Sequence, residues 1–561
     1  MARLGSILSA SDDYLDPDER ERRARQKERE LIERRLTPDW FTRRRDLCIP
    51  SGLRVAIVGG GFAGLYAGAY LKACGIRAVV FEAMDRVGGR VWTDRSFIPG
   101  KVVEAGAELI GENHPLWRIL ARQFGLTLIP LTEDDDYERA GLLVRLRFGT
   151  HDLTPAEKTQ MATELRTPLA AIGADGLTVR DEERPWLARD AARWDSISVR
   201  QRLDELRVPA SSLARKWIAF TLGNDNCAEI DAQSYLGLVG SVSAARMGSD
   251  PRGMLGYWMS TETHRCAGGN DLIASRLSRI LGSDVRLQTT VDAIQIQPGY
   301  WPPVVVQVSR RDGSGRVIAG QSEAFDFAIL ATPPTVWSSV RVTPPFPAAG
   351  RTIQHGPSIK YLTRAPTAYW IPAGLAPNTR WDHLGSVWES TDGQGSTPGY
   401  GLSVFSGGPF VQPTAAYGPK LTQLYPTRPV SAAPPTDRMI DWPSTPHVMT
   451  GYGVPGVGQA STVHPAQWLP HQGRLYFAGE QTSPGFFGYM EGALQSGARA
   501  ARDLISTMVR PCPRPEWIAG DPGGPEPNDG GALPGGTGGP DDSGFRGGGG
   551  ESGGGGASGE Y

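Results

Sequence analysis

The segment from Val55 to Glu82 constrains the fold more than any other part of this chain. Its sequence, VAIVGGGFAGLYAGAYLKACGIRAVVFE, predicts a strand, a tight turn, a helix and a second strand. In the turn, Gly59 permits the sharp bend, Gly61 lets the backbone approach a pyrophosphate, and Gly64 lets the helix pack closely on the strand. Glu82 ends the second strand, where its carboxylate can accept hydrogen bonds from ribose hydroxyls. This order predicts a dinucleotide site on an α/β fold.

The first part of this segment allows one alternative interpretation. From Val55 to Leu71 the chain carries no charge and is almost long enough to cross a membrane. Five glycines lie in that stretch, three of them consecutive, and they argue against a stable membrane span. The regular continuation to Glu82 argues against it as well, so we favour the dinucleotide site.

Composition excludes several classes of protein. A length of 561 residues allows for about two to four domains. A net charge of −2 gives no sign of a nucleic acid or an anionic membrane surface as partner. The five cysteines and eight histidines show no metal-ligand spacing, and so few cysteines, in odd number, argue against a disulfide framework. No apolar run follows a basic start, so we expect a cytoplasmic protein that binds no metal.

The two ends of the chain differ from its body. Residues 12–35 are rich in Arg and Glu at helical spacing, which predicts a solvated helix lying across the body, within a charged N-terminal arm of residues 1–52. A partner-binding role is the alternative for this arm. Residues 513–561 are rich in Gly, Pro and Asp and cannot bury enough apolar surface to offset their ordering entropy. We therefore expect a disordered tail.

The body is expected to be an α/β protein of two domains. A Rossmann-like cofactor domain would be assembled from residues 53–125, 265–334 and 475–508. Residues 126–264 and 335–474 would form a substrate domain with mixed sheet and helices. Helices are predicted at 153–172 and 199–206, and strands at 285–287, 291–296, 304–308, 325–331, 358–363 and 401–405.

Two further motifs define the cofactor more closely. RVGGRVWT spans residues 86–93, soon after Glu82, and YFAGEQTSPGFFGYMEGALQSG spans residues 476–497. With these motifs, residues 53–508 resemble the flavin-containing amine oxidase family, which includes monoamine and polyamine oxidases, L-amino-acid oxidases and amino-acid 2-monooxygenases. The third motif is most similar in sequence to that of bacterial L-amino-acid oxidases. The resemblance implies FAD as the cofactor.

The resemblance also implies which residues contact FAD. Arg86 and Arg90 match arginines near the pyrophosphate, where planar guanidinium groups suit phosphate oxygens. The helix that begins near Gly488 would face the flavin pyrimidine ring, where its dipole stabilises the negative charge of reduced flavin. The complete expected set is Gly59, Gly61, Phe62, Ala63, Gly64, Glu82, Ala83, Gly89, Arg90, Ala107, Glu108, Val291, Gly479, Glu480, Gly488, Tyr489 and Met490.

Three residues are expected from the resemblance at the reacting end of the cofactor. Tyr489 matches the aromatic residue that flanks the substrate amine, with a core tyrosine as the alternative. Lys360, the one lysine in an apolar strand, matches a lysine that bonds through water to flavin N5, with an edge-strand lysine as the alternative. The second wall of the amine cage would be Tyr452 or Met449, and we favour Tyr452. No cysteine lies near residues 446–453, so we expect non-covalent FAD.

Glu108 makes the substrate harder to infer. It stands where several L-amino-acid oxidases and tryptophan 2-monooxygenases carry an arginine that binds the substrate carboxylate. That arginine could come instead from Arg145, Arg147 or the segment 246–252. Glu108 itself could recognise a second cation on a basic amino acid or polyamine, which makes it a fourth candidate catalytic-site residue.

These observations predict an FAD-dependent oxidase that removes a hydride from the C–N bond of an amine, first of all an L-amino acid. The products would be an imine, then a 2-oxo acid and ammonia, and hydrogen peroxide. The alternatives are an amino-acid 2-monooxygenase, a mono- or polyamine oxidase, a flavin-dependent desaturase, and a catalytically silent flavoprotein scaffold. The expected partners are an amine or amino acid and dioxygen, with no nucleic acid or membrane, and a homodimer is one assembly to test.

Overall fold

The computed structural model describes residues 17–44, 47–245, 254–297, 299–312, 316–347, 350–395, 397–429 and 437–511. These residues belong to one compact unit of the chain. The expected disordered tail at 513–561 lies outside them, as do residues 12–16 of the expected N-terminal helix. Helices and sheets are mixed throughout, so the predicted α/β class is confirmed. The domain boundaries stay a prediction.

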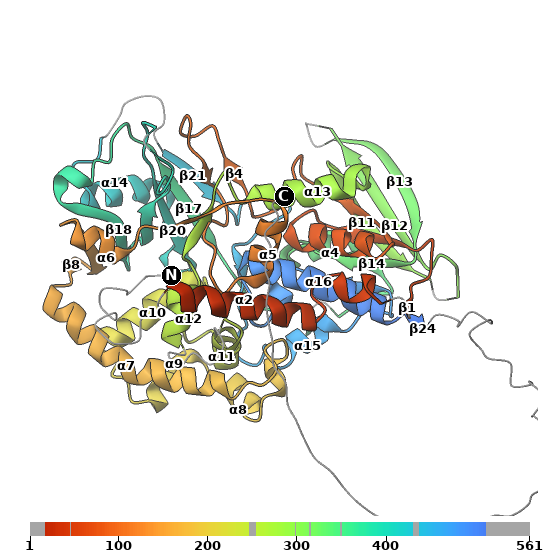
Figure 1. The fold of residues 1–561 in the computed structure, drawn as a ribbon, viewed down its shortest axis with the longest axis horizontal. Helices are drawn as coiled ribbons and strands as arrows, with labels where there is room; N and C mark the ends of the chain where they lie inside the picture. Colours follow the sequence, from red (N-terminus) through yellow and green to blue (C-terminus); the bar gives the residue numbers. More distant parts are fainter. Residues whose placement is uncertain are drawn as a thin grey trace, which may run out of the picture. The chain divides into compact units, whose positions relative to one another are not determined.

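A five-stranded parallel sheet brings the three predicted cofactor segments together (Figure 1). Its order is β10 (Val285–Arg286), β3 (Arg77–Phe81), β2 (Arg54–Val58), β14 (Phe327–Leu330) and β23 (Leu475–Phe477). One face packs on α4 (Phe62–Ala73), α13 (Asp271–Leu281) and α16 (Met490–Ser506). The other face packs on a mixed sheet in which β11 (Thr289–Ile296), β12 (Val304–Arg311) and β13 (Val317–Phe325) are antiparallel.

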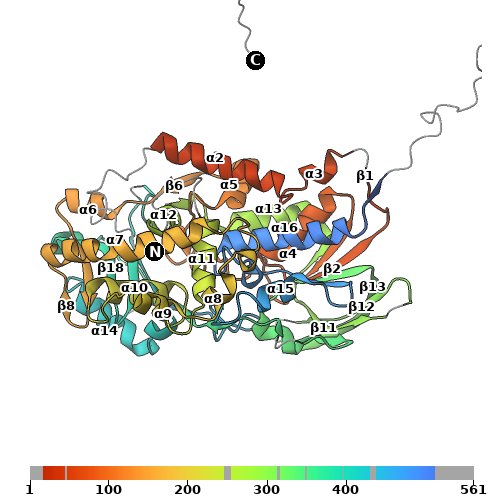
Figure 2. The same cartoon turned by 90° about the horizontal axis from the view of Figure 1, so that it is seen from below.

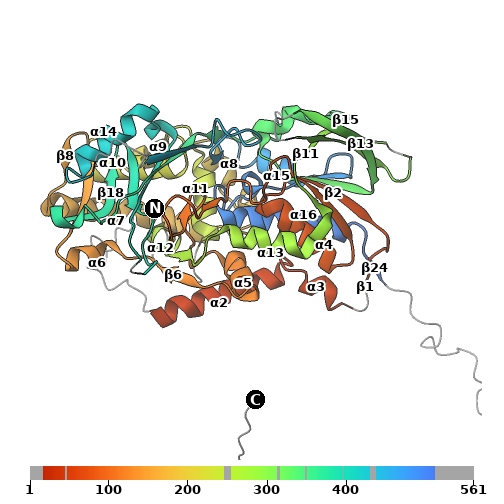
Figure 3. The ribbon, with the colours of Figure 1, turned by 90° about the horizontal axis from the view of Figure 1, so that it is seen from above.

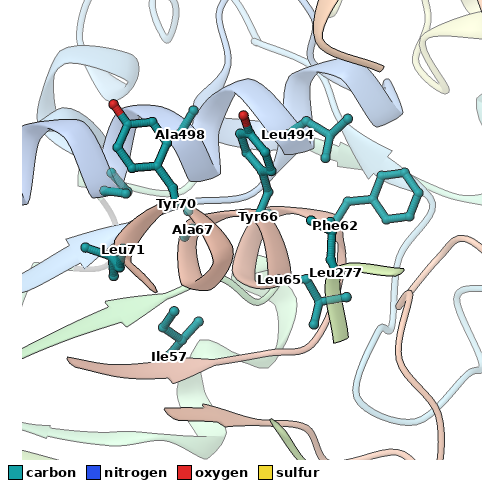
Figure 4. Close-up of a cluster of buried hydrophobic side chains, with 14 of the residues drawn as sticks. Ile57, Phe62, Leu65, Tyr66, Ala67, Tyr70, Leu71, Leu277, Leu494 and Ala498 are labelled. Atoms are coloured by element: carbon teal, nitrogen blue, oxygen red, sulfur yellow. The ribbon is translucent and has the colours of Figure 1, made fainter. Parts of the chain in front are cut away.

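Alternation along the strands explains these two faces. In β2, Val55 and Ile57 belong to the helix-side core, whereas Ala56 and Val58 belong to the core between the two sheets. Figure 4 shows the helix-side core, where Tyr66 and Tyr70 of α4 lie beneath α16. A Cβ on Gly497 of α16 would lie 2.2 Å from the carbonyl oxygen of Ala63, so only glycine allows the two helices this close. The predicted strand at 325–331 is split, because β13 ends at Phe325 before β14 begins.

A seven-stranded sheet lies at the other end of the unit (Figures 1 and 3). Its order is β21 (Asp437–Asp441), β17 (Ser358–Thr363), β20 (Leu402–Gly407), β19 (Gly385–Glu389), β18 (Leu375–Trp381), β7 (Leu143–Phe148) and β8 (His151–Asp152). One face is apolar and packs on α14 (Thr414–Leu424). The opposite face carries Lys360, Phe405 and Arg380 and lines the cavity described below.

Helices fill the region between residues 155 and 260. They are α7 (Pro155–Leu177), α8 (Ala191–Asp195), α9 (Val199–Glu205), α10 (Leu213–Asp225), α11 (Tyr235–Ala244) and α12 (Met254–Ser260). Thr154 caps α7 by accepting a hydrogen bond from the Glu157 backbone N–H, so the helix begins at Pro155 rather than at 153. It then continues through Pro168 to Leu177, five residues beyond the predicted end.

The N-terminal helix is less solvated than its charge predicts. Helix α2 (Pro17–Glu33) packs on α5 (Pro115–Gln123), as Figure 2 shows. Ala24, Lys27, Glu28 and Leu31 are buried, and Glu28 forms ion pairs with Arg118 and Arg122 of α5. The expected helix across the body is therefore present, but it is less solvated than its charge suggests, because these four buried positions form a face that the charge pattern does not show.

The remaining elements are short. The helices are α3 (Asp39–Thr42), α6 (Asp134–Arg139) and α15 (Val463–Trp468), with 3₁₀ turns at Pro185–Leu187, Gly282–Asp284, Pro334–Ser339, Ile371–Ala373, Gly408–Phe410 and Glu480–Thr482. The strands are β1 (Leu47–Cys48), β4 (Thr93–Asp94), β5 (Val103–Glu104), β6 (Leu128–Pro130), β9 (His264–Cys266), β15 (Arg341–Thr343), β16 (His355–Gly356), β22 (Tyr452–Gly453) and β24 (Arg510–Pro511).

Two expectations drawn from composition meet different outcomes. Among the described residues, no helix is both long enough and apolar enough to cross a membrane. The cytoplasmic location stays a prediction. The cysteine count argued against a disulfide framework, and Cys74, Cys227 and Cys266 are free, while Cys48 alone among the described cysteines is disulfide-bonded. Strand β1, which contains Cys48, pairs with β24 near the other end of the described chain, and spacing along a sequence cannot reveal such a long-range approach.

Candidate active site

A cavity of about 690 Å³ joins the parallel sheet to the seven-stranded sheet. The glycine turn, the loop at 88–91, the start of α16 and strands β17 to β20 all contribute to its wall. The residues predicted for cofactor binding or catalysis line it, with the exceptions of Gly64 and Arg86. A Cβ on Gly64 would lie 2.0 Å from the carbonyl oxygen of Gly59, so this glycine acts behind the wall by allowing α4 to approach the turn.

The glycine turn leaves room for a ligand at the start of α4. A Cβ on Gly61 would meet no atom within 4 Å, and Gly59 has φ +105°, which favours glycine. The Glu82 carboxylate accepts hydrogen bonds from the backbone N–H of Gly60 at 2.6 Å and of Met84 at 2.8 Å. Burial raises the pKa of Glu82. Glu82 therefore holds the turn in shape, with its side chain at the cavity wall.

Arg90 and Glu480 connect three distant segments of the wall. Arg90 Nη1 donates to the Gly451 carbonyl at 2.6 Å and to Glu480 Oε1 at 2.9 Å. Glu480 also accepts from the backbone N–H of Gly453 at 3.1 Å and of Gly488 at 2.7 Å. This pair fixes the loop before α16 against the second motif.

Arg86 does not join Arg90 at the cavity. Its guanidinium donates to the carbonyl of Gly89 at 2.9 Å and to those of Val87 and Val91 at 3.3 Å. The prediction that both arginines face the pyrophosphate is therefore corrected for Arg86, which is used to shape its own loop.

The start of α16 opens into the cavity. Tyr489 is the N-cap residue, and Tyr489, Met490 and Ala493 line the wall. Glu491 points the other way and accepts hydrogen bonds from the backbone N–H of Leu116 at 3.0 Å and Trp117 at 2.9 Å. The free N–H groups at this helix end and at α4 give the cavity two positive dipole ends, which suit a phosphate and a reduced flavin ring.

Lys360 and Glu108 form the core of a buried charge cluster. The Lys360 ammonium pairs with Glu108 Oε2 and donates to the Gly106 carbonyl at 3.1 Å. The other carboxylate oxygen of Glu108 receives Arg265 at 2.7 Å and the Trp388 indole N–H at 2.9 Å. Burial acts to raise the pKa of Glu108, but the charges of Lys360 and Arg265 outweigh it, so the pKa is lowered. Glu108 is thus an ionised carboxylate with cations on both oxygens.

This cluster bears on two earlier alternatives. Strand β17 lies between β21 and β20, so Lys360 is not an edge-strand lysine. Both oxygens of Glu108 are already paired with cations of the chain, so the structure does not support Glu108 as the receptor for a second cation on a substrate.

Two tyrosines, Tyr452 and Tyr489, lie close together in the cavity wall. A Cβ on Gly488 would lie 2.8 Å from Cδ2 of Tyr452, which places this ring against the residue that precedes Tyr489. The Tyr489 hydroxyl is 3.0 Å from that of Tyr257, and the Tyr452 hydroxyl donates to the backbone carbonyl of Asp225. Met449, the alternative second wall, has 56% of its surface exposed and does not line the cavity.

The arginines on the substrate side differ from those expected. Arg145 donates to the Leu424 carbonyl and Arg147 pairs with Asp152 at 2.6 Å, and neither lines the cavity. The segment 246–252 lies outside the described residues. The lining arginines on this side are Arg265 and Arg380. Strand register brings Arg380 there, and no short motif marks it.

The residues around the cavity fit FAD. The open space at Gly61 can accept a pyrophosphate beside the N-terminus of α4, and Arg90 lies at the same wall. Lys360 and the start of α16 line the same cavity, where the flavin ring is expected. Among the described cysteines, none lines the cavity, as non-covalent binding requires.

Comparisons with known proteins agree with this geometry. Residues 62–505 match the family described as flavin containing amine oxidoreductase. A flavin-containing amine oxidase of Oncorhynchus mykiss is 24% identical over 485 residues, covering 81% of this chain and 86% of that protein. The (S)-6-hydroxynicotine oxidase of Paenarthrobacter nicotinovorans is 26% identical over 464 residues, covering 80% of this chain and 98% of that protein.

A solved structure of putrescine oxidase bound to putrescine shares the fold. It superposes with a TM-score of 0.66 at 22% identity, covering 81% of this chain and 99% of that chain. The family match takes in well over half of the 561 residues. The chain belongs to the flavin-containing amine oxidoreductase family, as an oxidoreductase that uses FAD.

Proposed function

We propose that this amine oxidase acts on a small primary amine, with an L-amino acid as the first candidate, and binds FAD without a covalent bond. One observation carries the proposal: a single cavity runs from the glycine turn at Gly61 to Lys360, Tyr452 and Tyr489. A dinucleotide cofactor and a small amine can therefore meet in the same cavity.

The chain positions the amine, and the cofactor supplies the redox chemistry. When bound, FAD would supply the redox chemistry, as an acceptor of hydride from the carbon that bears the amine, and dioxygen can re-oxidise it. Tyr489 and Tyr452 offer aromatic faces whose hydroxyls are fixed by Tyr257 and by the Asp225 carbonyl. Burial is the main cause that raises the pKa of both tyrosines well above the ordinary value. Both hydroxyls therefore stay protonated at pH 7, and neither acts as a base.

A mono- or polyamine oxidase is the second candidate. Five carboxylates line the cavity away from the glycine motifs, namely Asp134, Asp225, Glu262, Glu389 and Asp392. Such a wall favours cations. The solved putrescine oxidase, which was bound to putrescine, offers a precedent in the same fold.

A peroxide-coupled screen of the purified yellow protein tests the proposal. The panel contains the L- and D-amino acids and a set of mono- and polyamines, with each product identified by mass. We expect peroxide and a 2-oxo acid from at least one L-amino acid. An amide one carbon shorter would replace the oxidase by a monooxygenase, and turnover of carboxylate-free amines alone would establish the second candidate.

Two controls accompany the screen. Precipitation with acid should release all flavin into the supernatant if FAD is non-covalent. Flavin that dithionite reduces, with no peroxide from any amine, would overturn the proposal and leave a desaturase or a scaffold.

A further inference from the structure

Arg380 is a buried guanidinium that lacks partners on the cavity wall. It lies in β18, has 8% of its surface exposed and lines the cavity. Its Nε and Nη1 atoms are buried and have no hydrogen-bond partner. Leaving a buried charge unpaired is costly, so an anionic group of a ligand would be stabilised at this point. Arg265 in the same wall differs, because Glu108 already pairs with it.

Asp225 presents the opposite charge in the same wall. It is the last residue of α10, and its Oδ2 atom is buried without a hydrogen-bond partner. Burial raises the pKa of Asp225, and the nearby charge of Arg380 acts in the other direction. Arg380 and Asp225 line the same cavity, and no ion pair joins them among the described residues. A ligand with one group of each charge would satisfy both.

Strand register places Arg380 relative to the reacting end. Lys360 lies opposite Phe405, Phe405 opposite Ser386, and Ser386 opposite Arg380. All four line the cavity, so they form one row across β17, β20, β19 and β18. Three strand spacings separate the Cα atoms of Lys360 and Arg380, about 14 Å, and both long side chains can reach into that gap.

Asp225 lies nearer to the tyrosines. The Tyr452 hydroxyl donates to its backbone carbonyl, and the charge of Asp225 contributes to the raised pKa of Tyr489. The ring of Tyr452 also stacks on Phe405, with centroids 6.3 Å apart and planes 7° apart. An amine held by Asp225 would therefore lie beside both tyrosine rings.

We propose that Arg380 and Asp225 together recognise the amino-acid group of the substrate, with Arg380 binding the carboxylate and Asp225 accepting hydrogen bonds from the amine. Guanidinium groups bind carboxylates through two parallel hydrogen bonds, and Arg380 has donors to spare. Arg380 thereby supplies the carboxylate anchor that Glu108 cannot provide. The inference rests on the proposed amine oxidation and narrows its substrate class to amines that carry a carboxylate.

Matched substrate pairs test this inference on the FAD-loaded enzyme. Each pair is an L-amino acid and the amine left after removal of its carboxylate: lysine with cadaverine, ornithine with putrescine, phenylalanine with phenethylamine, tyrosine with tyramine. We expect the amino acid to be the better substrate in the preferred pair. Arg380→Gln should raise its KM about 10- to 100-fold and change KM for the paired amine by less than about 3-fold. Arg147→Gln, an arginine of the neighbouring strand β7 that does not line the cavity, serves as the control and should change neither.

A binding measurement tests the same inference without relying on turnover. 2-Aminoisobutyrate has no hydrogen on the α-carbon, so it can bind without being oxidised, and tert-butylamine is its carboxylate-free counterpart. We expect 2-aminoisobutyrate to shift the flavin absorbance of the wild-type enzyme at a lower concentration than tert-butylamine, and Asp225→Asn to weaken both.

Two results would overturn the inference. One is a wild-type preference for the carboxylate-free member of every pair. The other is an Arg380→Gln variant that binds FAD and keeps the wild-type KM for the amino acid. Failure of the proposed function would look different, because no member of any pair would then yield peroxide.

Discussion

The two ends of the cavity are built in opposite ways. At the cofactor end, the wall consists of glycines, helix N-termini and charged side chains that are already paired, such as Arg90 with Glu480. At the substrate end, the wall consists of side chains from a sheet whose strands are distant in sequence, and Arg380 and Asp225 keep unpaired atoms.

This difference follows from what each end binds. A constant cofactor can be held by backbone geometry, which a short motif encodes because its residues are neighbours in the chain. A substrate is distinguished by side-chain charge, and the charges meet only after four strands have paired in register. We therefore expect FAD binding to be lost when a glycine that leaves room for the cofactor or for close packing is replaced. We expect substrate binding and turnover to be lost when a charged side chain is replaced.

Substitutions at two glycines test folding and cofactor binding separately, and they have the largest expected effect. Gly64→Ala puts a methyl group 2.0 Å from the Gly59 carbonyl, so α4 must shift; we expect a loss of about 3 kcal/mol in stability together with loss of bound FAD. Gly61→Ala puts its methyl group into open cavity space at φ −75°. The apoprotein should keep wild-type stability while FAD affinity falls at least about 10-fold.

Thermal unfolding of the apoproteins and titration with FAD measure the two effects separately. Gly68→Ala, in the same helix, is the control, because its methyl group would meet only side-chain atoms of Leu281 and Ile57 at 3.1 Å or more. If Gly61→Ala bound FAD as tightly as the wild type, the pyrophosphate would have to lie elsewhere.

The charge cluster at Lys360 is the next largest test. Lys360→Met leaves the buried carboxylate of Glu108 with Arg265 as its remaining ion-pair partner, so we expect a loss of about 3 kcal/mol. Turnover should fall as well, since the ammonium lies at the flavin-ring end. Adding Glu108→Gln removes the carboxylate that Lys360 and Arg265 share, so the double variant should lose less stability than the sum of the two single variants and should not regain turnover.

Urea unfolding and peroxide assays on the two single variants, the double variant and the wild type complete the cycle. A double variant as active as the wild type would show that Lys360 serves packing alone. Independent, additive losses of stability would show that the two charges do not interact.

The sequence foretold the cofactor end far better than the substrate end, and the reason is physical. Gly59, Gly61 and Glu82 lie within 24 residues, and the spacing alone fixes their relation. Lys360 was found because a charge in an apolar strand is unusual. Arg380 had no such signal: its strand, LAPNTRW, has no regular alternation, and its place opposite Ser386 depends on pairings that no local pattern states.

Errors elsewhere have the same origin. Arg86 was expected at the pyrophosphate because it belongs to a recognisable motif, but a motif does not say which of its two arginines faces the cavity. The buried side of α2 was missed because Lys27 and Glu28 count as polar in a pattern, although both are at least 94% buried against neighbouring elements. Partners, rather than residue types, decide burial for charged side chains.

The smallest expected effect concerns Glu104, a carboxyl group near Glu108 and Lys360. Glu104 is buried and accepts hydrogen bonds from the Asn270 backbone N–H and the Thr93 hydroxyl, both at 2.8 Å. Burial raises its pKa from 4.5 to about 8. Between these two values the folded state binds more protons than the unfolded state, so the free energy of unfolding falls as the pH rises from 4.5 to 8. Glu104→Gln removes that contribution, because the amide cannot titrate.

We therefore expect the Tm of the wild-type apoprotein to fall more steeply between pH 6 and pH 8, about the upper part of this window, than the Tm of Glu104→Gln. Glu205 provides the matched control: it is an exposed glutamate whose pKa is lowered, because its desolvation is outweighed by its hydrogen bonds to Arg202 and Arg193, so its contribution to stability is lost only as the pH falls below 4.5. Glu205→Gln should leave the slope above pH 6 unchanged. Equal slopes for the wild type and Glu104→Gln would mean that Glu104 is ionised at neutral pH, and a second negative charge would then lie near Glu108. In that case Lys360 and Arg265 would balance two carboxylates, and the cofactor end would share the charge dependence that we assign to the substrate end.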